Sequence, residues 1–347
     1  MPPVRSPLPA IALLALLVPA GASERAREDG TGAGAPPDRL SETGLYEPGT
    51  LRLSPDVLAF SPRYALWSDG AAKRRWVYLP PGTAIDASDP GAWQFPPGTR
   101  FWKEFSHAAA VETRLIERLD DGTWRYAAYV WNREGTDAFL APDYGVARLP
   151  ADGAPGGTYV VPSQEDCRMC HEGGPTPVLG FSAFQLAADR DALAPNVEQA
   201  VDGDVNLPAL ASRGLVSGVA DLPAVRQAPA DALERTATGY LHANCAHCHN
   251  DRGPLSDLDL SLSVADAGGV DRILETLLNR TADSTVQSLR IRVVPGAPGD
   301  SQLVARMKTR NPNHQMPPLG TRVTDNDAVA LVERWIAHMK TPEGNTP

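Results

Sequence analysis

The chain has 347 residues, of which 42% are hydrophobic, and a formal net charge of −10 at pH 7. This length suits two domains, and the apolar content is enough to build a core for each. The acidic balance argues against nucleic-acid binding, because contacts to phosphate require clustered Lys and Arg side chains.

The N-terminus is typical of a secretory signal peptide over residues 1–22. Arg5 supplies the charged start, Ile11–Val18 the apolar run and Ala20–Ala22 a small-residue cleavage site. The run is too short to span a bilayer, and no other stretch is long enough, so we expect no membrane span after cleavage. A short N-terminal anchor is the alternative. Residues 23–44 are rich in Gly, Ala, Pro and charge, which predicts a disordered leader.

Residues 45–162 contain six of the seven tryptophans and most of the turn-forming Pro and Gly pairs. Three short segments are aromatic or β-branched and bounded by turn residues, as strands are: Arg75–Leu79, Val111–Ile116 and Trp124–Trp131. The pattern predicts an antiparallel β domain with a sandwich architecture.

A C-x-x-C-H motif lies in the next segment, residues 163–230, as Cys167, Cys170 and His171. Two thiols three positions apart can each add to one vinyl group of a porphyrin, and the adjacent histidine then lies under the iron. Residues 159–164, which lead into this motif, are typical of a strand and a turn.

A second C-x-x-C-H motif, formed by Cys245, Cys248 and His249, lies in the predicted helical region, residues 231–340. Helical spacing predicts one helix that runs directly into this motif and two that follow it. These helices are Asp231–Asn244, Ser301–Thr309 and a C-terminal helix that begins at a capping box of Thr324 with Asp327 and carries Trp335 and Met339.

The two motifs use every cysteine in the chain, which predicts two covalently attached haem c groups. A redox dithiol or half of a zinc site is the competing interpretation. The histidine directly after each second cysteine argues against both, as does the lack of a βαβ pattern or of zinc-ligand spacing.

The helical region resembles class I cytochromes c, in which a helix leads into the haem motif and crosses a C-terminal helix. Ala237, Leu241 and Trp335 stand at the positions of that crossing. The longer stretch from Tyr64 to Lys340 resembles secreted bacterial dihaem cytochromes c. This wider resemblance rests on Tyr64–Gly70, Phe101–Phe105, Val178–Phe181, Tyr240–Asn250 and Met316–Pro318.

The resemblance implies haem binding and electron transfer, with an axial methionine from a Met-Pro-Pro loop, here Met316. His314 is the rival ligand, and Met307 fits a core position better. In class I cytochromes c a proline carbonyl after the motif accepts the other imidazole N–H, and Pro175 and Pro254 follow the two motifs here.

The periphery of the two sites is less defined by the sequence. Arg290, Arg292 and Arg306 are candidates for pairing with haem propionates, with solvated surface positions as the alternative. No methionine or other histidine lies between His171 and His242, so the first haem lacks a local sixth ligand. Three histidines, His107, His242 and His338, are candidates to close it, or it is five-coordinate.

The sequence thus predicts an α+β multidomain chain, with an antiparallel β domain before a mainly helical cytochrome c-like haem module. We expect a periplasmic or secreted dihaem electron-transfer protein whose acidity favours a basic redox partner. An open first haem would instead suit a peroxidase or oxidase. A third hypothesis is a β-domain binding module with accessory haems.

Overall fold

The computed structural model describes residues 34–198, 203–219 and 231–340. The predicted signal peptide and the part of the leader up to residue 33 lie outside the described residues. Within them, no helix has the length and apolar content needed to cross a membrane.

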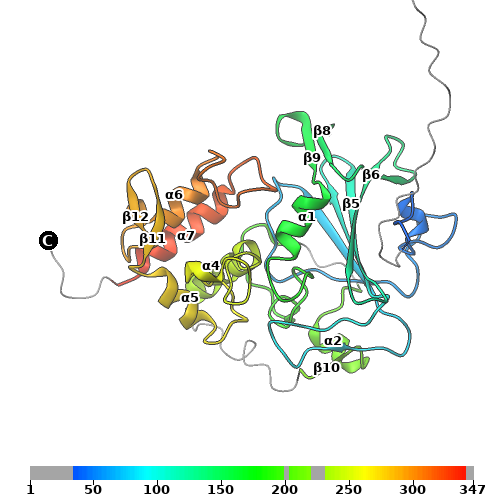
Figure 1. Ribbon diagram of the computed structural model, residues 1–347, viewed down its shortest axis with the longest axis horizontal. Coiled ribbons are helices and arrows are strands. Elements are labelled where there is room, and N and C mark those ends of the chain that lie inside the picture. Colours follow the sequence, from blue (N-terminus) through cyan, green and yellow to red (C-terminus); the bar gives the residue numbers. More distant parts are fainter. Residues whose placement is uncertain (1–33, 199–202, 220–230, 341–347) are drawn as a thin grey trace, which may run out of the picture. The chain divides into compact units, whose positions relative to one another are not determined.

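The tryptophan-rich region forms a six-stranded antiparallel sheet with the strand order β1-β2-β4-β5-β6-β7 (Figure 1). Its strands are β1 (Leu58–Ala59), β2 (Ala72–Tyr78), β4 (Arg100–Ser106), β5 (Ala110–Arg118), β6 (Trp124–Trp131) and β7 (Ala138–Leu140). Short turns join the central strands, and Gly122 adopts a φ of +85° between β5 and β6, where a side chain would be strained. The three predicted strands are confirmed, and β6 has the predicted bounds.

The predicted sandwich is wrong, because no second large sheet packs on the first in the described part of the chain. The other pairs are two-stranded: β3 (Ile85–Asp86) with β10 (Val216–Ser217), β8 (Val146–Pro150) with β9 (Thr158–Val161), and β11 (Thr281–Val286) with β12 (Leu289–Ile291). Loops and short helices cover the large sheet instead. One face packs Phe101 against Phe181 and Leu210, and this cluster joins the first haem segment to the β region.

The prediction that residues 23–44 form a disordered leader is wrong for the described part of that segment, which packs on the opposite face of the sheet. Leu40, in the 3₁₀ helix η1 (Leu40–Glu42), and Leu45 are fully buried against Trp76 and Trp102. The ordered chain therefore begins before Leu45. Residues 34–44 include few large apolar side chains, which is why the sequence suggested disorder. Leu40 nevertheless covers an aromatic face of the sheet that would otherwise be exposed to water.

Helices dominate from β9 onward: α1 (Gln164–His171), α2 (Leu207–Ser212), α4 (Ala232–Cys245), α5 (Val270–Leu277), α6 (Gln302–Lys308) and α7 (Asn326–His338). Single 3₁₀ turns, η2 (Pro155–Gly157), η3 (Ser256–Leu258) and η4 (Pro298–Asp300), occur in the connections. The three helices predicted from spacing are confirmed as α4, α6 and α7.

Helices α4 and α7 pack against each other around a buried cluster that contains Ala237, Leu241 and Trp335. Asp231 caps α4 by accepting a hydrogen bond from the Glu234 amide at 2.8 Å. The predicted cap of α7 is one residue out of place. Asp325 accepts from the amide of the third helical residue at 3.1 Å, because the Thr324 hydroxyl is turned away to donate to a carbonyl in α6.

Candidate haem-binding pockets

The first motif lies on α1, which begins where strand β9 ends. Ser163 and Asp166 form a reciprocal capping box: the Ser163 hydroxyl accepts from the Asp166 amide at 3.1 Å, and the Asp166 carboxylate accepts from the Ser163 amide at 2.9 Å. Helix α1 packs against β6 (Figure 1). The three motif residues are therefore held within two turns of one helix, beside the sheet.

Cys167, Cys170 and His171 line a pocket of about 350 Å³, named here the first pocket. The Nδ1 of His171 donates to the carbonyl oxygen of Pro177 at 2.6 Å, which leaves Nε2 free for a metal. This bond differs from the expectation, which placed the acceptor at Pro175. Helix α1 ends at His171, and the chain must turn before a carbonyl can reach back to the ring.

The second motif begins at the last residue of α4. Cys245, Cys248 and His249 line a larger, mostly apolar cavity of about 710 Å³, the second pocket, and Met316 is also in its wall. This volume is in the range of cofactor sites. His314 lies outside the residues that line it. Met307 is buried in the helical core, as expected.

The expected proline bond at the second motif is wrong. The Nδ1 of His249 is buried with no hydrogen-bond partner among the described residues, and Pro254 lines the pocket wall instead. Burial lowers the pKa of His249, so its ring is neutral at pH 7, which is the form that binds a metal.

Two arginines of the predicted three line the second pocket, Arg292 and Arg306. Their guanidinium groups donate to backbone carbonyls and neutral side chains, such as the carbonyl oxygen of Leu258 at 2.6 Å. Neither forms an ion pair with a described carboxylate. Two half-buried cations that form no ion pair fit the propionates of a haem. Arg290 lies outside the lining.

The two pockets adjoin, and three residues line both: Asn244, His247 and Pro317. The segments directly after the two motifs are also in contact, because the Asn250 side-chain amide donates to the carbonyl of Gly173 at 2.8 Å. His247 is thus in the wall between the two pockets.

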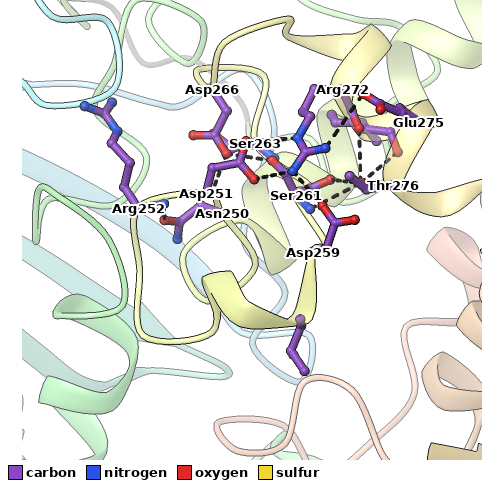
Figure 2. Close-up of polar contacts among 12 residues, drawn as sticks. Asn250, Asp251, Arg252, Asp259, Ser261, Ser263, Asp266, Arg272, Glu275 and Thr276 are labelled. Carbon is purple, nitrogen blue, oxygen red and sulfur yellow. Dashed lines mark hydrogen bonds and ion pairs between the residues drawn. The ribbon is translucent and has the colours of Figure 1, made fainter. Parts of the chain in front are cut away.

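A polar network holds the loop that follows the second motif (Figure 2). The Arg272 guanidinium donates to Asp251 and Asp259 at 2.8–3.0 Å, and Asp266 accepts from the Ser261 hydroxyl at 2.6 Å. Four leucines of this part of the chain line the second pocket: Leu255, Leu258, Leu260 and Leu262. The network holds the loop that supplies this apolar part of the pocket wall.

The segment around Trp67 has a positioning role that the sequence did not reveal. The Trp67 backbone amide donates to the Asn244 side chain at 2.7 Å, directly before the second motif. The Asp69 carboxylate accepts from the amides of Arg322 and Val323 at 2.9–3.0 Å. This segment therefore ties α4 and the loop after Met316 to the sheet.

All four cysteines are free thiols in the structure. Burial raises the pKa of Cys170 to about 11 and that of Cys245 to about 12. Redox-active dithiols and zinc ligands require thiolates, which a lowered pKa provides. Among the residues that the structure describes, no three His, Cys, Asp or Glu side chains converge as ligands of a metal ion.

The structure distinguishes the three histidines that the sequence offered as a sixth ligand at the first motif. His338 is exposed at the end of α7, and its Nδ1 hydrogen-bonds its own helix. His242 packs edge-on against Phe184, away from the pocket. His107 lines the first pocket, but its Nε2 is enclosed by protein atoms with no partner in the described chain.

Two further pocket residues were missed, Lys103 and Met169. Lys103 lines the first pocket, and the exposed Met169, inside the first motif, lines the second. The sequence did contain a signal for Lys103. Side chains two positions apart in a strand lie on the same face, so the alternation puts Lys103 on the apolar face of Phe101 and Phe105. Nothing local indicated that Met169 would reach the other site.

Searches of protein-family models, curated proteins and solved structures with this chain returned no match.

Proposed function

We propose that the chain is an exported dihaem c-type cytochrome that transfers electrons in the periplasm or outside the cell. One observation carries the proposal: two adjoining pockets each contain both cysteines and the histidine of one C-x-x-C-H motif. The spacing alone suits haem attachment, and the pockets add the enclosed, largely apolar space that a porphyrin needs.

The chain's own residues would hold each group in place. Cys167 and Cys170, and Cys245 and Cys248, provide the thiols for thioether bonds, while His171 and His249 provide the proximal nitrogens. Bound haem would supply reversible one-electron chemistry at iron.

Met316 is the proposed sixth ligand in the second pocket, where Arg292 and Arg306 would neutralise the propionates. A thioether ligand raises the reduction potential relative to a second histidine. The leucine-rich wall adds apolar surface, which lowers the local dielectric. A low dielectric disfavours the charged oxidised state and would therefore also raise the reduction potential.

The partner is proposed to be a redox protein with a basic docking surface. The net charge of −10 favours such a surface by electrostatic attraction. Association should then weaken as ionic strength rises, because exposed charges are screened beyond about 8 Å at physiological salt.

The test is the haem content of full-length protein matured in a host that attaches haem c. A pyridine haemochrome assay and the intact mass of the mature chain should both give about two haems per chain. A bare polypeptide, or one carrying a single macrocycle, would contradict the proposal.

The ligand in the second pocket has its own test. Met316→Ala should abolish the sulfur-to-iron charge-transfer band of the oxidised protein. Met169→Ala is the matched control, since Met169 lines the same pocket, and it should keep the band. Loss of the band in the control alone would assign the ligand to Met169.

A further inference from the structure

Lys103 is an unusual residue in the first pocket. It lies in the middle of β4, between Arg75 on β2 and Arg114 on β5, and all three side chains are on the sheet face that lines the pocket. Its neighbouring strands enclose it on both sides, so the surface that it keeps faces the pocket.

The other cations on this face have acidic partners. Arg75 and Lys73 form ion pairs with Glu198, and Arg114 forms a bidentate pair with Glu112 at 2.8–2.9 Å. Lys103 has neither a hydrogen bond nor an ion pair in the described part of the chain, and its Nζ lies 4.8 Å from the centroid of the Phe105 ring. Lysines in such surroundings are almost always paired, because an isolated buried charge is costly.

From this geometry, and given the proposed function, we infer that Lys103 supplies the distal ligand of the haem attached at Cys167 and Cys170. A neutral amine offers one lone pair to iron. If the group starts as an ammonium, its proton leaves to solvent when the Fe–N bond forms, and no electron is transferred.

The surroundings favour the neutral form of this amine. Burial, with the positive charges of Arg75, Lys73 and Arg114, lowers the pKa of Lys103 well below its usual value. Lys103 and the proximal His171 both line the first pocket.

Two histidines in the lining of the same pocket are rival ligands. One is His247, between the cysteines of the second motif, and its ligation would give the bis-histidine signature that the experiment below distinguishes. The other is His107. Its Nε2 is covered by protein atoms and therefore does not open onto the space where a haem would lie. The ring packs edge-on against Tyr159, with centroids 6.0 Å apart, at the turn after β4. His107 would have to leave this contact to reach an iron.

The experiment uses full-length protein with both haems attached and reads the coordination of each iron. The near-infrared magnetic circular dichroism of the ferric protein should show one histidine–amine and one histidine–methionine pair. In Lys103→Ala and Lys103→Arg, the histidine–amine band should disappear, and the reduced protein should bind about one carbon monoxide per chain, whereas wild type should bind none.

His107→Ala is the matched control and should retain both bands. The inference is overturned if both Lys103 variants keep two low-spin haems, if His107→Ala alone opens an iron, or if wild type already binds carbon monoxide. Should the Lys103 variants not accumulate, the wild-type spectrum decides, because a bis-histidine signature excludes the amine. A wild-type chain with fewer than two haems would instead refute the proposed function.

Discussion

Gly173, two residues after the first C-x-x-C-H motif, lies against the second motif, and Gly173→Ala tests that contact. A Cβ at this position would overlap the carbonyl oxygen of His247 and lie 3.2 Å from its carbon and 3.5 Å from the Cα of Cys248. These are backbone atoms of the second motif, which cannot rotate away. The motifs must therefore move apart.

The magnitude follows from three effects. Overpacking against backbone costs about 1–3 kcal/mol. The movement also lengthens the buried hydrogen bond from Asn250 to the Gly173 carbonyl, for a further loss of about 1–3 kcal/mol. Alanine restricts the unfolded chain, which returns about 0.4–1 kcal/mol. We expect a net loss of about 2–4 kcal/mol in the free energy of unfolding.

The assay is denaturant unfolding of the two-haem protein, with Gly174→Ala as the control. A Cβ at Gly174 would lie 3.6 Å from the Asn250 side-chain nitrogen, which is ordinary contact, so this variant should stay within about 0.5 kcal/mol of wild type. The reasoning is refuted if the two variants unfold at the same denaturant concentration.

Three further predictions concern the supports of the second pocket. Asp69→Ala should lose about 1–3 kcal/mol of unfolding free energy and weaken the Met316 charge-transfer band, because two amides of the loop lose their acceptor; an unchanged band would show that Asp69 does not position the loop. Arg272→Ala should lose about 1–2 kcal/mol of unfolding free energy, and less at high salt, because its ion pairs with Asp251 and Asp259 hold the loop. The exposed Arg280→Ala should lose almost nothing in the same assay, and equal losses would contradict this role of Arg272. Burial raises the pKa of Asp325, so the folded state binds its proton more tightly than the unfolded state, and stability should fall as pH rises from about 4 through the raised pKa. Asp325→Asn keeps a capping oxygen and should remove that part of the pH dependence. An unaltered profile of stability against pH would show that Asp325 is not its source.

Local features were readable from the sequence because they depend on neighbouring residues. The spacing of Ala237 and Leu241 predicted α4, and alternation with flanking turns predicted β6. The C-x-x-C-H spacing likewise carries its chemistry within five residues. These patterns need no knowledge of where the segments lie in space.

Features that depend on distant contacts were not predicted. Composition suggested a sandwich and a disordered leader, but Leu40 and the loops around Phe181 cover the sheet instead. The acceptor for His171 was placed two residues too early, since the path of the loop decides which carbonyl reaches the ring.

What the sequence by itself determined is the two C-x-x-C-H motifs, the strand that leads toward the first and the helix that leads into the second. Helix α1, which carries the first motif, was not predicted. Only the tertiary structure decided that Gly173 meets the second motif, that Trp67 and Asp69 support the Met316 loop, and that Lys103 faces the first pocket. The reason is physical: hydrogen bonding and side-chain periodicity within a helix or strand are set over a few residues, whereas packing joins segments up to 256 positions apart and depends on the whole chain.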